Sequence, residues 1–451
     1  MSDTADLREI ARGLVARATA AGARAADAVV VESDGLSVGV RLGDVEKLTR
    51  ARQRRAGLRV FVGESSAIVS TADFSRDALD DLARQACTLA RHTAADRFAG
   101  LPDPAALASD VPDLDLYDPA VEQLDPEQAI AWARDAEAAA LGTSSEITNS
   151  EGGELGAEAG QVAYASTAGF VGGYTGSRAS LAVVPVATRD GGMQRDSWYT
   201  AHRKLAGLEP PAAVGREAAR RTLRRLGARR PPTCECPVVF EAETAASLLR
   251  HLAGAVSGSA LYRRMSFLVD RLGEKIASDA VTVVDDPLRP AGPASRPFDA
   301  EGVAQQRRGI VERGVLTSYL LDSYSARRLG LQTTGHASRS VGDAPGAAPT
   351  NFFLEPGPHT PEQIIASVRT GIYVTELIGF GVNPVTGDYS RGAAGLWIEN
   401  GELAYSVEEL TIAGNLKDIF RDIEMVGNDL VLRNAVAAPT LKIGRMTVAG
   451  T

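Results

Sequence analysis

Few side chains in this sequence are suited to binding a metal ion, and they are widely separated. The histidines are His92, His202, His251, His336 and His359, and the cysteines are Cys87, Cys234 and Cys236. A zinc site needs several such ligands together, and an HExxH helix, which places two histidines on one face, is absent. Cys234 and Cys236 are too closely spaced for a CxxC redox or zinc motif, so we interpret them as reduced structural thiols. Spacing alone predicts no zinc site.

Two glycine-containing motifs have the outline of a catalytic or nucleotide-binding loop. The segment GLSVG, Gly35 to Gly39, formally matches the GxSxG motif that presents a nucleophilic serine between a strand and a helix. Here Ser37 lies inside an alternating strand pattern, and no convincing helix begins after it. The segment GFGVNP, Gly379 to Pro384, has proline where GxGxxG needs its third glycine. Both segments are interpreted as strand or turn structure.

Several carboxylates gather in the segment VVDDPLRPAGPASRPFDAEG, residues 283–302. They are Asp285, Asp286, Asp299 and Glu301. Paired carboxylates serve acid–base chemistry, and several together can hold a hard cation. No companion nucleophile or second set of ligands is visible, and the segment from Asp299 to Gly302 precedes an alternating stretch, as a strand-entry turn does. A structural role is favoured for these carboxylates.

The elements that must position these residues can be predicted from hydrophobic spacing. Residues 4–22 repeat apolar positions at helical spacing, and a second helix is expected from about Ser75. Between them, residues 27–50 alternate like two paired strands with Ser33-Asp34-Gly35 as the turn, and GLRVFVG and SAIVSTADF continue the sheet. Residues 93–125 are loop-like, and a further helix is expected over 126–141. The prediction is an α+β fold with helices covering one side of a largely antiparallel sheet.

Length and proline content predict two domains, because 451 residues exceed one simple core. Pro231 and Pro232 mark a boundary between an N-terminal α+β domain over 1–230 and a mixed, strand-rich C-terminal domain over 231–451. Seven arginines lie between Arg216 and Arg230, which we interpret as a solvated helix face ending in a linker. The second domain opens with a strand, followed by the helix that carries His251.

The overall composition is that of a soluble globular protein, with 44% hydrophobic and 23% charged residues and a net charge of −9. This charge gives no electrostatic case for binding nucleic acid or an anionic membrane surface, so neither is expected as a partner. The first residues are charged throughout and lack the apolar stretch of a signal peptide, and no apolar run approaches the length of a membrane span. A cytoplasmic location is expected.

Long segments of the C-terminal half closely resemble the TldD/PmbA family. They are, in order, SGSALYRRMSFLVDRLGEKIASDAVTVVDDP, FDAEGVAQQRRGIVERGVLTSYLLDSYSARRLGLQTTG, GVNPVTGDYSRGAAGLWIENGELAYSVEELTIAGNLKDIF and VGNDL. The N-terminal segment GLSVGVRLGDVEKLTRARQRRAGLRVFVG resembles the same family, so the resemblance covers essentially the whole chain. This family contains modulators and maturation proteases that act on short or unfolded peptides, and the resemblance implies its fold and a part in proteolysis.

The resemblance also implies that the family's zinc site is lost here. In the TldD branch a His-Glu-x-x-x-His helix supplies two zinc ligands and the general base, and a cysteine near the C-terminus is thought to complete the site. In this chain His251 stands at the first ligand, Leu252 replaces the catalytic glutamate and Val256 replaces the second histidine. The C-terminal segment LRNAVAAPTLKIGRMTVAG contains no cysteine. One imidazole does not hold zinc at cellular concentrations, so no metal and no catalytic residue are expected in this chain.

The replaced positions extend an apolar stripe along the helix. Its members are Ala245, Leu248, Leu249, Leu252, Ala255 and Val256. This pattern predicts that the helix packs into a core or an interface. His251 is then expected to be a structural, hydrogen-bonding residue, with a contact to substrate or partner as the alternative.

The resemblance is to the PmbA branch, also called TldE, which keeps the fold without the zinc site and pairs with a TldD-type partner. It implies a subunit of a heteromeric zinc metallopeptidase that presents unfolded or short peptides to the zinc of that partner. Extended peptides commonly add a strand to a sheet edge, and the glycine-rich segment 376–401 is a candidate wall of such a cleft. Its candidate peptide contacts are Gly379, Gly381, Asn383, Asp388, Tyr389 and Arg391. The alternative is an ordinary turn and strand of the core sheet.

Two other functions stay open. The first is a self-sufficient peptidase with an unrecognised nucleophile or metal, which would require clustered polar groups in a cleft. The second is a homo-oligomeric peptide-binding protein, a homodimer when isolated, that has no proteolytic partner. A neighbouring gene that encodes an intact His-Glu-x-x-x-His motif would argue against the second.

Overall fold

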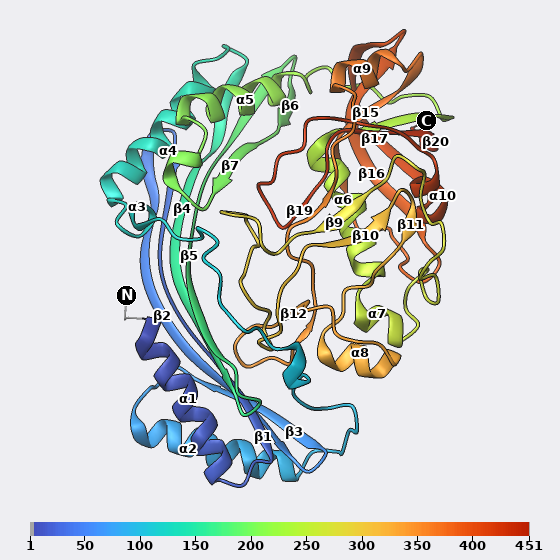
Figure 1. Cartoon of the computed structure of the whole chain (residues 1–451). Coiled ribbons are helices and arrows are strands. Elements are labelled where there is room, and N and C mark those ends of the chain that lie inside the picture. The colour runs from blue at the N-terminus through green and yellow to red at the C-terminus, as the bar shows by residue number, and fades with distance from the viewer. Residues whose placement is uncertain (1–3, 451) are drawn as a thin grey trace.

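The computed structural model describes residues 4–450, and its N-terminal half is built on one long, curved sheet (Figure 1). Within the described residues the strand order is β3-β2-β1-β4-β5-β6, with β7 beside β5, and neighbouring strands are antiparallel. The strands are β1 (Ala25–Arg41), β2 (Asp44–Val62), β3 (Ser65–Thr71), β4 (Ile147–Ser166), β5 (Val171–Arg189), β6 (Gly192–Arg195) and β7 (Trp198–His202). The expected antiparallel sheet is confirmed.

The turn expected at Ser33-Asp34-Gly35 is wrong. Strand β1 continues through these residues, which pair with β2 on one side and with β4 on the other. The chain reverses instead at Leu42 and Gly43, whose φ angles are 49° and 84°. Two consecutive residues with positive φ form the tight turn that matches the twist of paired strands. Both neighbouring strands form backbone hydrogen bonds around Gly35, so the chain continues through this glycine as a strand.

Helices cover the outer face of the sheet, as expected (Figure 1). They are α1 (Thr4–Ala20), α2 (Arg76–Arg91), α4 (Pro126–Leu141) and α5 (Pro211–Leu223). Alternate residues of a strand face the same side, and the even-numbered apolar residues of β1 are buried against these helices. Ala26, Ala28 and Val30 share a core with α1 and α2, whereas Leu36 and Val38 share one with α4 and α5.

The segment between α2 and α4 first packs on the C-terminal half and then returns to the sheet, where the helix α3 (Pro119–Glu122) contacts β4 and β5. It also contains a short 3-10 turn, η1 (Pro104–Ala106). The guanidinium of Arg327 donates hydrogen bonds to the carbonyl oxygens of Phe98, Gly100 and Leu101, at 2.6, 2.9 and 3.1 Å. The two halves of the chain are therefore tied together by an arginine side chain bound to backbone carbonyl oxygens, far from their connection.

The C-terminal half is strand-rich and mixed, as expected. One sheet has the order β17-β16-β15-β8-β20-β18, and an additional pairing of β17 with β20 closes its first members into a barrel. Its strands are β8 (Cys234–Phe240), β15 (Thr370–Ile378), β16 (Asp388–Glu399), β17 (Glu402–Asn415), β18 (Ile423–Val426) and β20 (Leu441–Ala449). A second sheet has the order β11-β10-β9-β14-β19. Its strands, with the separate pair β12-β13, are β9 (Val283–Asp285), β10 (Arg308–Glu312), β11 (Val315–Leu316), β12 (Ala337–Ser338), β13 (Gly346–Ala347), β14 (Phe352–Leu354) and β19 (Val436–Ala437).

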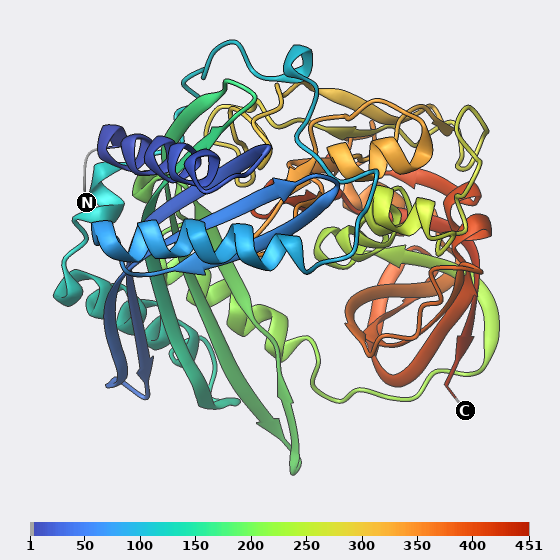
Figure 2. The same cartoon turned by 90° about the horizontal axis from the view of Figure 1, so that it is seen from below.

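Helix α6 (Ala242–Ala255), which carries His251, lies in the core of this half and contacts strands of both sheets. The other helical segments are η2 (Leu205–Gly207), α7 (Gly258–Tyr262), α8 (Ser323–Leu329), α9 (Pro361–Ala366) and α10 (Leu416–Arg421). An extended connection that contains Pro231 and Pro232 runs from α5 to β8 (Figure 2). Among the described residues, every helix is too short or too polar to span a lipid bilayer.

Candidate functional site

A cavity of about 780 Å³ opens between the two halves of the chain, beside α6. The N-terminal half contributes residues from β4 to β7 and from α5 and the turn that follows it, including Trp198 and Arg221. The C-terminal half contributes α6, the end of β15 and the start of β16, including His251 and Arg391. The cavity therefore lies at the helix position that the sequence singled out.

His251 is half-buried at this cavity. Its Nε2 atom is buried and has no hydrogen-bond partner among the described residues. The imidazole ring meets the ring of Tyr389 edge-on, with 6.1 Å between centroids and 80° between planes. Burial lowers the pKa of His251, and the charges of Arg391 and Arg250 lower it further. The imidazole is therefore held in its neutral form, with one nitrogen available for a ligand.

Arg391 reaches the same place from β16. Its Nη1 atom donates a hydrogen bond of 3.1 Å to the hydroxyl of Ser247, which lies one turn before His251 on α6. Its Nε atom is buried and has no partner among the described residues, and the same is true of the hydroxyl of Tyr389, whose side chain is 1% exposed. Burial raises the pKa of Tyr389, so its hydroxyl stays protonated.

The positions of the lost zinc motif are packed. Leu252 is 1% exposed and Val256 is 0% exposed, and all members of the apolar stripe belong to the largest core cluster. The described part of the chain contains no group of three or more histidine, cysteine, aspartate or glutamate side chains placed to hold a metal ion. A single imidazole flanked by two arginines does not fit a zinc ion, which needs several nitrogen, sulfur or carboxylate ligands.

The glycine-rich segment forms the hairpin that joins β15 to β16, and much of its polar chemistry serves its own turn. The Asn383 side-chain oxygen accepts a hydrogen bond of 2.9 Å from the backbone N–H of Val385. The Asp388 carboxylate accepts hydrogen bonds from the Thr386 hydroxyl at 2.6 Å and from the Asn415 amide at 3.0 Å. These contacts are those of an ordinary turn.

Of the sequence-predicted contacts, Arg391 lines the large cavity, whereas Gly379, Gly381, Asn383, Asp388 and Tyr389 are absent from the residues that line it. Phe380, between the two glycines, does line the cavity and is 99% exposed. Sequence reasoning missed this residue. The sequence does contain a signal for it, a lone aromatic residue between two glycines in a segment interpreted as a turn.

Each carboxylate that lines the cavity pairs with an arginine, whereas two of the cavity's arginines have no carboxylate partner among the described residues. The carboxylates and their arginine partners are Glu151 with Arg195, Asp196 with Arg221, Glu243 with Arg433, and Glu376 with Arg225. Among the described residues, neither Arg250 nor Arg391 has a carboxylate within 4.0 Å. The cavity therefore carries an excess of positive charge next to His251.

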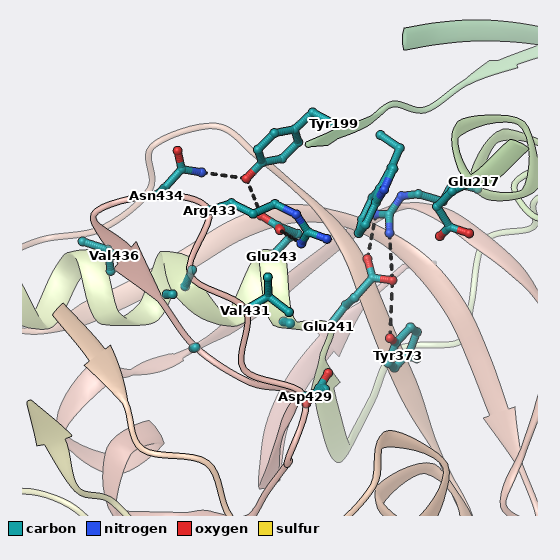
Figure 3. A pocket seen from close by; sticks show the side chains of 16 residues that line it. Tyr199, Glu217, Glu241, Glu243, Tyr373, Asp429, Val431, Arg433, Asn434 and Val436 are labelled. Atoms are coloured by element: carbon teal, nitrogen blue, oxygen red, sulfur yellow. Dashed lines mark hydrogen bonds and ion pairs between the residues drawn. The ribbon is translucent and has the colours of Figure 1, made fainter. Parts of the chain in front are cut away.

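A smaller cavity of about 200 Å³ adjoins the first and shows how the two halves are clamped (Figure 3). The Tyr199 hydroxyl donates to the Glu243 carboxylate at 3.1 Å and accepts from the Asn434 amide at 2.6 Å. Burial and the neighbouring Glu243 raise the pKa of Tyr199 to about 12, so this donor is retained at neutral pH. The contacts run from β7 to α6 and to the loop before β19, and they fix the cleft walls.

The acidic segment 283–302 lies elsewhere, and its carboxylates are used within the structure. Asp285 accepts from the Thr350 backbone N–H at 2.7 Å. Asp299 accepts from backbone N–H groups, among them that of Val303 at 2.9 Å. Glu301 accepts from the Arg59 guanidinium at 3.1 Å. These bonds organise loops and tie the second half to the sheet, which agrees with a structural role.

Comparison with known proteins gives consistent matches along the chain. Residues 26–90, 119–226 and 233–450 match models described as PmbA/TldA metallopeptidase domain 1, central domain and C-terminal domain. A protein named metalloprotease PmbA from Escherichia coli O157:H7 is 41% identical over 94% of this chain and 92% of its own length. A metalloprotease PmbA homolog from Haemophilus influenzae is 36% identical over 99% of this chain and 96% of its own.

Solved structures show the same fold. A proposed modulator of DNA gyrase from Bacteroides thetaiotaomicron is 28% identical, with a TM-score of 0.93 and full coverage of both chains. TldE from Thermococcus kodakarensis has a TM-score of 0.89 over 98% of this chain and 100% of its own. At 20% identity the latter match concerns the fold alone.

Proposed function

This chain belongs to the PmbA/TldD metallopeptidase family, and we propose that it is the non-catalytic, peptide-binding subunit of a heteromeric zinc metallopeptidase. The observation that carries the proposal is the state of α6. At the family's metal helix, this chain offers the single ligand His251, and the packed side chains of Leu252 and Val256 replace the others. A zinc-bearing, TldD-type partner then supplies the metal that activates water.

The cavity between the two halves is the feature that fits peptide binding. Residues of both halves line it, and Phe380 and Arg391 are among them. An exposed aromatic side chain offers apolar contact area, and a guanidinium orients polar groups. In this proposal the chain forms one wall of the substrate cleft, holds an unfolded or short peptide, and works in the cytoplasm.

The test compares this chain alone, a TldD-type partner from the same organism alone, and their mixture. Bound zinc is measured by atomic absorption, and cleavage of an unstructured peptide is followed by mass spectrometry. We expect no zinc and no cleavage for this chain alone, and chelator-sensitive cleavage by the mixture that exceeds that of the partner. A partner variant with its motif glutamate replaced by glutamine is the control, and its mixture should be inactive.

Two outcomes would overturn the proposal. Stoichiometric zinc or cleavage by this chain alone would identify a self-sufficient peptidase. Peptide binding by a homo-oligomer that neither associates with the partner nor changes its activity would identify a peptide-binding protein of a different kind.

A further inference from the structure

Three buried polar atoms without partners belong to side chains that meet at the junction of β16 and α6. They are Nε of Arg391, Nε2 of His251 and the hydroxyl oxygen of Tyr389, and each is buried without a partner among the described residues. Tyr389 and Arg391 are two residues apart on β16, so their side chains leave the strand on the same face. That face meets α6, because Arg391 bonds Ser247 and the Tyr389 ring contacts His251.

Such a cluster is costly unless a ligand or water completes it, because a buried polar group without a partner loses its hydration and gains nothing. The atoms are suited to the same kind of ligand. The Nε–H of Arg391 and the hydroxyl of Tyr389 are donors, and His251 donates as well when its proton is on Nε2. An acceptor with several lone pairs is therefore the matching chemistry.

The charges at this place favour an anionic acceptor. The carboxylates that line the cavity are each paired with an arginine, whereas Arg391 and Arg250 have no carboxylate within ion-pair distance among the described residues. The bond from Arg391 to Ser247 holds the guanidinium at the wall of the cavity that Arg391 lines. Arginine binds a carboxylate through a fork of two hydrogen bonds from one edge of its guanidinium.

We propose that Arg391 and His251, which line the cavity with Tyr389 packed behind His251, form a carboxylate-binding subsite that anchors an acidic group of the bound peptide. The inference rests on the proposed function, because it specifies which peptides the cleft prefers. The carboxylate belongs either to the C-terminus of the peptide or to an aspartate or glutamate side chain.

Fluorescence anisotropy on the full chain tests this subsite with three dansylated eight-residue peptides. One has a free C-terminal carboxylate and no acidic side chain, the second is its C-terminal amide, and the third is an amide with one internal aspartate. We expect a carboxylate-bearing peptide to bind about ten-fold more tightly than the neutral amide. Preference for the first peptide identifies a C-terminal anchor, and preference for the third identifies a side-chain anchor.

Matched variants locate the effect. Arg391→Gln should reduce the preference to about two-fold or less, and Arg391→Lys, which keeps the charge without the fork, should give an intermediate value. His251→Gln, which keeps a donor, should retain most of the preference. Arg84→Gln, an arginine on α2 that is paired with Asp81 away from the cavity, is the control and should behave as the unmodified chain. Thermal unfolding of each variant checks that it is folded.

The inference fails if folded Arg391→Gln keeps the full preference, or if the unmodified chain binds acid and amide peptides equally. Equal binding leaves the proposed function standing, because peptides are still bound. Absence of binding to all three peptides, together with a mixture that does not cleave, overturns both.

Discussion

Glu241 accepts two hydrogen bonds from the guanidinium of Arg221, at 3.0 and 2.7 Å. Arg221 belongs to α5 in the N-terminal half, and Glu241 is the residue that precedes α6 in the C-terminal half. Both side chains are buried, and the Tyr373 hydroxyl donates to the same carboxylate at 3.4 Å. The pair joins the two walls of the cleft at the start of the helix that carries His251.

Removing Arg221 should therefore weaken the whole chain. We expect Arg221→Met to lower the free energy of unfolding by about 3 kcal/mol, because it leaves the buried Glu241 carboxylate without its main partner. Urea denaturation measures the change. The matched control is Arg220→Met, whose ion pair with Glu217 is solvent-exposed on the arginine side and is expected to contribute less than about 1 kcal/mol. Equal losses of unfolding free energy for the two variants would contradict a special role of the Arg221–Glu241 pair in joining the two halves.

Reintroducing the motif glutamate should destabilise the chain without restoring activity. Leu252→Glu places a carboxylate at a position that is 1% exposed, so we expect a loss of about 3 kcal/mol or more in unfolding free energy. Urea denaturation and zinc analysis of this variant provide the test. Arg250→Glu, at an exposed position of the same helix, should cost much less. A stable variant that binds zinc would show that the helix is not packed as described.

The stability contribution of His251 should depend on pH. Burial, with Arg391 and Arg250, lowers the pKa of His251 in the folded chain below the value of about 6.5 found for an unfolded chain. As the pH falls below that value, the unfolded chain binds a proton that the folded chain does not, so stability decreases. The loss ends once the pH is below the folded pKa.

Comparing the unmodified chain with His251→Gln isolates this effect, because both proteins contain the other histidines. Urea denaturation between about pH 8 and about pH 5 gives the free energy of unfolding of each protein. As the pH falls, this free energy should decrease less for the variant than for the unmodified chain. A difference that stays constant with pH would mean that the environment of His251 does not disfavour its charge.

Phe380 should matter for binding and not for folding. Its side chain is 99% exposed at the cavity, so Phe380→Ser should change the unfolding free energy by less than about 0.5 kcal/mol. Peptide affinity should fall about five-fold, because the peptide loses apolar contact area. Anisotropy measures the affinity, and Leu89→Ser, an exposed leucine on α2, is the control. Unchanged affinity would remove Phe380 from the cleft wall.

Local signals predicted several elements well. The helix expected over 126–141 is α4, because Asp125 caps its N-terminus and Pro126 fits the first helical position. Ser75 likewise caps α2 and accepts from the Ala78 backbone N–H. The failure at Ser33-Asp34-Gly35 has an equally physical cause: turn-forming residues also fit inside a long strand when neighbours on both sides bond its backbone.

The site was predicted only in part, because its members come from distant segments. Motif spacing identified His251, and the glycine-rich segment contained Arg391, but no local pattern links them. The arginine-rich segment illustrates the same limit. It was expected to be a solvated face, yet Arg221 is buried and Arg224 bonds Glu241, because a carboxylate from another element meets them. Such partners are fixed by the tertiary fold and leave no trace in helical periodicity.

Strand β8 lies between β15 and β20 in the barrel, and β20 also pairs with β17. A ribosome releases residues 234–240 long before residues 441–449, so the backbone N–H and C=O groups on one edge of β8 stay unpaired while the intervening chain is made. The N-terminal sheet pairs largely sequence neighbours, and its long-range pairing of β1 with β4 becomes possible once residues 147–166 have been made. Synthesis therefore produces a folded sheet first and a barrel much later. A nascent chain stalled before residue 441 contains every strand of the barrel except β20, so the edge of β8 that pairs with β20 stays unpaired.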